Sequence, residues 1–248
     1  KVSELEKLGV RKERQSVFPS GLAILIASFN VLDIQSMEVS DGALREGLLY
    51  ELIGRNTHEN VQKRTINGLQ KRYLVDVEHA SIVAKTAIHL WHKVAPEWRI
   101  GDGESAELLH WSAMLHEIGL AISHSQYHKH GAYLIRYADL AGFSRQSQHA
   151  IAVLIRFHRR KINHQLFSGY CQENRRNLKK LTVILRLAVL IQRARNQIDP
   201  REIAAKGTED AIKLSFPEGW LKSHSLVAAD LKAEKTRLKK FSMNLAFQ

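Results

Sequence analysis

The chain has very little cysteine, few aromatic residues and no long apolar run. Its 248 residues include one cysteine, Cys171, so no intramolecular disulfide can form, which fits a reducing cytosol. Aromatic residues make up 7% of the chain and are not interleaved with its basic clusters, which argues against a stacking platform for single-stranded nucleic acid. No apolar run approaches the roughly 20 residues that span a bilayer. We therefore expect a cytoplasmic protein that does not bind nucleic acid, with peripheral association at the inner membrane face left open.

The start of the chain also lacks a targeting signal. The segment "KVSELEKLGV" is no signal peptide, and it does not begin with methionine. We expect the chain to be a piece of a longer protein.

Positive charge is abundant and unevenly distributed. Residues 1–54 carry six Lys and Arg against eight Asp and Glu, whereas residues 156–195 carry eleven Lys and Arg against one Glu. With a net charge of +12, this concentration predicts a polyanionic partner. A generically basic, solvated surface is the alternative.

The hydrophobic patterning predicts a mainly α fold with three parts. Residues 1–54 read as the end of an α/β domain, in which 14–18 form a short strand and 22–32 a buried apolar helix. Residues 55–198 repeat apolar positions at three- and four-residue spacing, which predicts a compact helical domain. Residues 199–248 predict a small α+β domain.

That last part has its own internal pattern. Residues 210–216 and 242–247 read as two strands that pair with each other. An amphipathic helix over 223–241 is expected to cover one face of the pair.

Histidines gather in the helical part, where eleven of the thirteen lie between residues 79 and 164. Imidazole is the commonest metal ligand, and a ligand set usually combines histidines with a carboxylate from separate helices. The candidate site residues follow one another in the order His79, His116, Glu117, His130 and His158. Two alternatives stay open for His116, His128, His130 and His158: they could line an anion pocket, or they could be hydrogen-bonded core residues.

This order resembles the HD-domain phosphohydrolases, which bind a divalent metal through His, His-Asp and a downstream Asp. The resemblance implies that His79 and His116 match the first two histidines. Glu117 stands where Asp is usual, and Val189 stands where the last carboxylate is expected. Valine cannot ligate a metal, so we expect a vestigial, HD-like site without metal.

Longer stretches resemble a narrower family. The segments 39–53 ("VSDGALREGLLYELI"), 111–135 ("WSAMLHEIGLAISHSQYHKHGAYLI") and 153–161 ("VLIRFHRRK") are similar to the C-terminal half of the exopolyphosphatase / guanosine-pentaphosphate phosphohydrolase family. The resemblance implies an HD-like helical domain that follows the end of an actin-like domain. It also implies a homodimer that hydrolyses terminal phosphoanhydrides with Mg²⁺ bound by upstream actin-like domains of the same polypeptide. No catalytic residue is expected in this segment.

The basic helices complete the hypothesis. An inorganic polyphosphate chain needs a row of cations, and its affinity should fall steeply with salt. The predicted polyphosphate-binding track consists of Arg156, Arg159, Arg160, Lys161, Arg175, Arg176, Lys179 and Lys180. We therefore expect the polyphosphate-binding, processivity region of an exopolyphosphatase.

Three alternatives remain open. Within the family, the protein could be a guanosine-pentaphosphate 5'-phosphohydrolase. Of other classes, it could be an independent HD-type metal phosphohydrolase or a nucleic-acid-binding module.

Overall fold

The structure is a computed structural model that describes residues 5, 9–37, 61–101, 103–163, 167, 170–195 and 198–248. By its internal contacts the chain divides into two compact units, Lys1–Thr57 and His58–Gln248. The stretch 39–53, which carried part of the family resemblance, lies outside the described residues. The division into three domains at residues 54 and 198 stays a prediction.

Two helices are described in the first unit, α1 (Lys12–Gln15) and α2 (Phe18–Leu32). Pro19 lies in the first turn of α2, where the N–H that proline lacks would have no partner in the helix. The strand predicted over 14–18 is wrong, because these residues close helical turns through backbone bonds to carbonyl groups three residues earlier. The helix predicted over 22–32 is confirmed.

The apolar side chains of α2 are exposed in this unit. No residue of α2 is buried, and Val31 is 82% and Ile24 70% exposed. This unit supplies no core against which the helix could pack, so the predicted burial stays a prediction that requires cover from upstream structure or a partner chain. A continuous apolar face of this kind is typical of an interaction surface.

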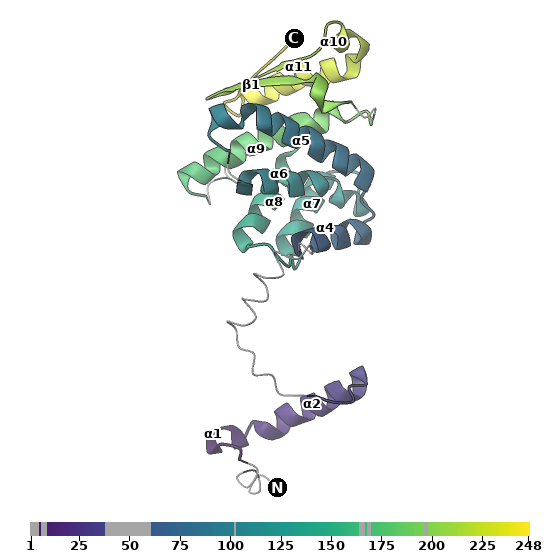
Figure 1. The fold of residues 1–248 in the computed structure, drawn as a ribbon, viewed down its shortest axis with the longest axis vertical. Helices are drawn as coiled ribbons and strands as arrows, with labels where there is room; N and C mark the ends of the chain where they lie inside the picture. The colour runs from purple at the N-terminus through teal and green to yellow at the C-terminus, as the bar shows by residue number, and fades with distance from the viewer. Residues whose placement is uncertain are drawn as a thin grey trace. The chain divides into compact units, whose positions relative to one another are not determined.

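The second unit is predominantly helical, and the mainly α fold class is confirmed. In Figure 1, α4 lies at one end of this unit and the sheet with α11 at the other, and the remaining long helices stack between them. The helices are α4 (Val61–Arg72), α5 (Val77–Trp98), α6 (Gly103–Met114), η2 (Ile118–Ala121), α7 (Tyr127–Tyr137), α8 (Arg145–Phe157) and α9 (Gln172–Ile191). The HD-like and actin-like assignments stay predictions.

One predicted helix is broken. The pattern predicts a continuous helix over 106–122, but α6 ends at Met114 and the chain makes a turn before η2. Gly119 explains the turn, because a Cβ there would lie 2.0 Å from the carbonyl oxygen of Tyr127. Only glycine permits this approach of η2 to α7, and the turn puts His116 and Glu117 between the two helices.

The C-terminal segment forms a three-stranded sheet in the order β1-β2-β3. The strands are β1 (Ala204–Thr208), β2 (Ala211–Ser215) and β3 (Asn244–Phe247); β1 pairs antiparallel and β3 parallel to β2. Both predicted strands and their pairing are confirmed, as is the helix α11 (Ser225–Lys239). The pattern missed β1, the short 3-10 helix η4 (Pro200–Glu202) and the short helix α10 (Trp220–Ser223).

This sheet shares one hydrophobic core with the helices. The core runs from Val83 on α5 to Leu245 on β3. Trp98, at the end of α5, packs against Gly207, whose missing side chain leaves room for the indole, and donates its Nε1–H to Thr208 O at 2.7 Å. The sheet is therefore built onto α5.

A buried ion pair also connects the C-terminal helix α11 to the helical body. Arg186 on α9 donates from Nε (2.5 Å) and Nη2 (3.0 Å) to the carboxylate of Glu234 on α11, and from Nη1 to Phe157 O at 2.5 Å. Both side chains are almost fully buried. The pair holds α8, α9 and α11 in one arrangement.

Candidate functional site: two adjoining cavities

A cluster of buried histidines lies at the centre of the second unit. His79 comes from the first turn of α5, His116 from the turn after α6 and His158 from the end of α8. The ring centroids are 5.7 Å apart for His79 and His116, and 5.5 Å for His116 and His158. The sequence order of these histidines therefore corresponds to a spatial cluster.

Backbone carbonyls fix the tautomers of two of these rings. His116 Nδ1 lies 2.7 Å from Ala113 O, and His158 Nδ1 lies 2.6 Å from Ile155 O. Because a carbonyl can only accept, each Nδ1 carries the proton and each Nε2 presents a lone pair. His116 Nε2 is buried and has no partner among the described residues.

Burial keeps the histidines neutral. It lowers the pKa of His116 to about 4, against an opposing attraction from Glu117. It also lowers the pKa of His158 well below its ordinary value, and the pKa of His79 in the same direction. Near pH 7 this cluster therefore contributes lone pairs and N–H groups but no positive charge.

The carboxylate beside the cluster is held by an arginine. Arg195 donates from Nη2 to Glu117 Oε2 at 3.0 Å, and its Nη1 pairs with Asp76, the N-cap of α5. The pKa of Asp76 is lowered, first by the backbone N–H of His79 and then by Arg195. The guanidinium thus bridges two carboxylates beside the histidines and balances one of their two negative charges.

These groups line a cavity of about 430 Å³, which we call the histidine cavity. Three carboxylates line it, and each is paired: Glu117 with Arg195, Asp230 with Arg193 and Glu234 with Arg186 and Arg237. Val189 lines the same cavity and is half-buried. The valine that replaces the last HD-type carboxylate therefore lies in the wall of this cavity.

A second cavity of about 960 Å³ adjoins the first and shares His124, Arg159 and Arg160 with it. We call it the basic cleft. Its charged lining residues are all cationic: Lys129, Arg156, Arg159, Arg160 and Lys161. None of these five has a carboxylate partner among the described residues.

A metal ion would find three donors in the histidine cavity. The side-chain donor atoms of His79, His116 and Glu117 lie within 4.8 Å of one another. Two imidazoles and one carboxylate do not fit Mg²⁺, which prefers all-oxygen coordination. They would suit a transition metal, but Arg195 already occupies the carboxylate. That no metal binds here stays a prediction.

The predicted basic track is divided by the fold. Arg156, Arg159, Arg160 and Lys161 line the basic cleft, whereas the four track residues of α9 (Arg175, Arg176, Lys179 and Lys180) line neither cavity. The structure therefore does not bring the two halves of the predicted track together in one cavity, and ligand contact by these four α9 residues stays a prediction.

Three of these four α9 residues contact other parts of the fold. Lys180 is buried and donates to Trp98 O at 3.0 Å, and Arg175 donates to Phe167 O and Tyr170 O, both at 3.1 Å. Lys179 lies over the Phe241 ring, and Arg176 is exposed.

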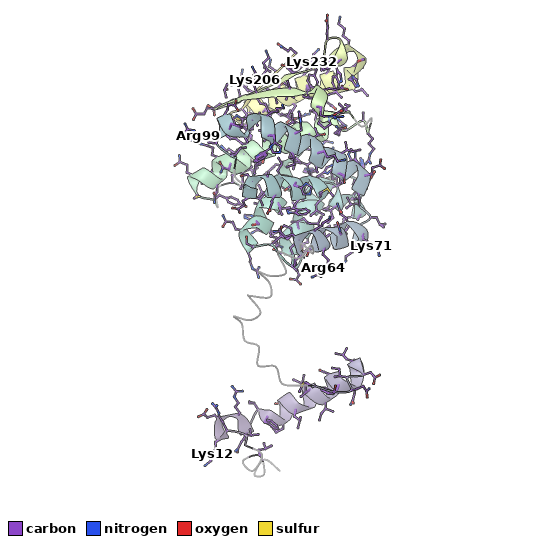
Figure 2. All side chains as sticks on the ribbon, in the orientation of Figure 1. Lys12, Arg64, Lys71, Arg99, Lys206 and Lys232 are labelled. Carbon is purple, nitrogen blue, oxygen red and sulfur yellow. The ribbon has the colours of Figure 1, made fainter. Side chains whose placement is uncertain are left out.

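Charge is also more widespread than the sequence suggested. Figure 2 shows the labelled basic side chains Arg64 and Lys71 at α4, and Lys206 and Lys232 in the layer of the sheet and α11. Net charge alone therefore does not locate a binding site. A cavity lined by cations that have no carboxylate partner is a more specific indication.

The structure separates one predicted residue from the others and adds one that the sequence did not single out. His130 on α7 is half-buried and lines neither cavity, so the structure does not bring it together with the other four HD-like residues, and its role stays a prediction. His128, named with the possible lining of an anion pocket, lines the basic cleft. Arg195 was missed. Arg195 had a weak signal, since it follows closely after Val189 in the basic run, but its partners are distant in sequence.

Comparison with known proteins covers almost the whole chain. A model described as "Ppx/GppA phosphatase, domain III" matches residues 61–235, and one described as "Ppx/GppA phosphatase family" matches residues 1–56. Three similar proteins carry the name guanosine-5'-triphosphate,3'-diphosphate pyrophosphatase. They are 37% identical over 97% of this chain in Aeromonas hydrophila, 38% over 96% in Photobacterium profundum and 36% over 98% in Pseudoalteromonas translucida.

The matched region is about half of each relative: it covers 48%, 47% and 49% of these three proteins. Among the described helices, none combines the length and apolar character needed to cross a membrane.

Proposed function

Because this chain belongs to the Ppx/GppA phosphatase family, we propose that it is part of a phosphoanhydride hydrolase that acts on guanosine-5'-triphosphate,3'-diphosphate. In this reaction water attacks the terminal phosphorus of the 5'-triphosphate, and the bond to the bridging oxygen breaks. Orthophosphate, a proton and guanosine 5'-diphosphate,3'-diphosphate are the products. The observation that carries the proposal is the similarity, along nearly the whole chain, to relatives with this name.

This chain would supply the C-terminal half of the enzyme. The helical body would be the HD-like domain, and the catalytic carboxylate and Mg²⁺ would lie in actin-like domains upstream in the same polypeptide. The histidine cavity does not fit Mg²⁺, so no catalytic step is assigned to it. A homodimer in the cytoplasm completes the proposal.

The guanosine nucleotide replaces long polyphosphate as the first choice of substrate. The relatives' printed names favour it. The division of the basic track also supports it, because a long polyanion needs cations in a continuous row. Lys180 and Arg175, which were to extend that row, hold backbone carbonyls instead.

Long-chain polyphosphate is the second candidate. Its supporting observation is the basic cleft, whose five cationic lining residues are accompanied by no acidic one. Such a cleft accepts the end of any oligophosphate, so its geometry does not exclude an exopolyphosphatase.

Orthophosphate release decides between the two. The intact protein with Mg²⁺ is given either guanosine-5'-triphosphate,3'-diphosphate or long-chain polyphosphate, at equal concentrations of chain ends. We expect kcat/KM to be at least tenfold higher for the nucleotide. A preference for polyphosphate would overturn the proposal.

Two other classes are tested by the same preparation. An independent HD-type hydrolase predicts stoichiometric transition metal and activity that depends on it. A nucleic-acid-binding module predicts retention of an oligonucleotide in competition with polyphosphate. Elemental analysis measures the bound metal, and a competition filter assay at two salt concentrations measures the retained oligonucleotide. We expect neither stoichiometric metal nor retained oligonucleotide.

A further inference from the structure

The walls of the basic cleft come from two separate segments of the chain. One wall comes from the loop and first turn around α7, including His124 and Lys129, and the other from the end of α8 and the residues after it. Aromatic contacts join the walls: the Tyr127 and His158 rings are 5.4 Å apart, and the Arg159 guanidinium lies 4.6 Å from the Tyr127 ring centroid. The cleft is therefore formed before any ligand arrives, which reduces the entropy lost on binding.

Its charge is uncompensated. In the histidine cavity each lining carboxylate has an arginine partner, but no carboxylate lines the basic cleft. Cations that converge in a concavity focus a positive potential, which an anion would neutralise. Arginine offers paired N–H donors that match phosphate oxygens.

A buried polar atom points to the same ligand. His128, at the wall of the cleft, is 5% exposed, and its Nδ1 has no hydrogen-bond partner among the described residues. Burial first, and then Arg156, Arg159, Lys129 and Arg160, lower the pKa of His128 to about 4. A buried group without a partner is uncommon in proteins and calls for an explanation. A phosphate oxygen at Nδ1 would provide one.

We propose that the basic cleft binds the di- or triphosphate group of the substrate, with Arg156, Arg159 and Arg160 as donors and His128 at its wall. The identity of the substrate rests on the proposed function above. The choice of a short oligophosphate group rests on the extent of the cleft. Its cations surround one cavity, and the α9 residues do not continue them. Phe157, the one phenyl ring in the lining, is 2% exposed, so it offers no stacking surface to a base.

The site is tested by chemical protection of lysines in the intact protein. Without divalent metal, so that nothing is hydrolysed, amines are acetylated with and without inorganic tripolyphosphate, and each lysine is followed by mass spectrometry. We expect acetylation of Lys129 and Lys161 to slow at least threefold, while Lys71 and Lys232, which Figure 2 places elsewhere on the unit, change less than 1.5-fold. Guanosine alone should protect none of the four.

Variants locate the donors. Arg159→Gln should abolish at least half of the protection, and Arg176→Gln, exposed on α9, should leave it intact. Equal slowing at all four lysines, no slowing, or the same protection by sulfate at equal ionic strength would overturn the site. Hydrolysis of the nucleotide without protection would refute the cleft and leave the proposed function standing. Protection of the lysines without hydrolysis of the nucleotide would support the cleft and refute the proposed function.

Discussion

The histidine cavity and the basic cleft share a wall and differ in how their charges are balanced. In the first, every lining carboxylate has an arginine partner and the buried histidines are neutral; in the second, which shares the unpaired Arg159 and Arg160 with the first, no carboxylate lines the wall. Paired charge stabilises the fold, whereas unpaired charge in a concavity raises the free energy until an anion binds. The difference assigns structure to one cavity and ligand binding to the other.

Breaking the buried pair in the histidine cavity should have the largest effect. Arg186→Leu leaves Glu234 buried with only the partly exposed Arg237, and removal of one partner of a buried pair costs about 3–5 kcal/mol. Urea unfolding measures the loss. Arg193→Leu, which breaks an exposed pair with Asp230, should cost less than about 1 kcal/mol. Equal losses would contradict a structural role for the buried pair.

The turn that carries His116 and Glu117 should depend on Gly119. A methyl group there would meet Tyr127 O at 2.0 Å, so Gly119→Ala should destabilise the protein by about 3 kcal/mol through forced backbone movement. Gly68→Ala in α4 is the matched control, because nothing lies within 4 Å of the new Cβ. That change should stabilise the helix by about 0.5–1 kcal/mol. Thermal unfolding of both variants checks the contrast, and a neutral Gly119→Ala would refute it.

Acid should weaken the fold through the histidines that both cavities bury. The pKa of His116 and that of His128 are each lowered to about 4, chiefly by burial, against an unfolded value near 6.5. Because the unfolded chain binds these protons first, the stability is complete above pH 6.5 and is lost as the pH falls towards 4. We expect about 1–3 kcal/mol per histidine. Urea unfolding between pH 7 and 4.5 measures the free energy of unfolding, which should fall less steeply with decreasing pH in His128→Gln than in wild type. The same pH dependence in both proteins would contradict a contribution from His128.

The arginine beside the histidines should keep metal out. Arg195→Ala frees Glu117 next to two neutral imidazoles, so affinity for Zn²⁺ should rise about tenfold, equivalent to about 1.4 kcal/mol. Calorimetric titration compares it with wild type and with Arg193→Ala, which leaves Glu117 paired. Equal Zn²⁺ affinity in all three would show that the guanidinium does not guard the donors.

Local sequence pattern predicted most of the helices, because their buried faces repeat at helical spacing. It missed β1, whose residues "AAKGT" offer little apolar alternation, since Gly207 is there to accommodate Trp98. It also missed the turn after Met114, since the apolar spacing continues through it. What breaks the helix is the approach of η2 to Tyr127, which is a tertiary contact.

Only part of the candidate site could be predicted, because local pattern does not reveal tertiary contacts. The order of His79, His116 and His158 was a reliable guide to a cluster, because each lies at or just beyond one end of a helix. The roles of Arg195 and Lys180 were beyond pattern reasoning: their partners Glu117 and Trp98 lie 78 and 82 positions away. A basic residue on a helix can contact a ligand or hold a carbonyl, and only the fold distinguishes the two.

The most direct test compares two charge-matched double variants of the intact protein. Arg156→Gln/Arg159→Gln removes two cations from the basic cleft, and Arg176→Gln/Lys222→Gln removes two exposed cations that line neither cavity. For hydrolysis of guanosine-5'-triphosphate,3'-diphosphate, we predict that the cleft variant raises KM at least tenfold and changes kcat less than twofold, while the surface variant leaves both within twofold of wild type. Equal KM values in the two variants would contradict the assignment of ligand binding to the basic cleft.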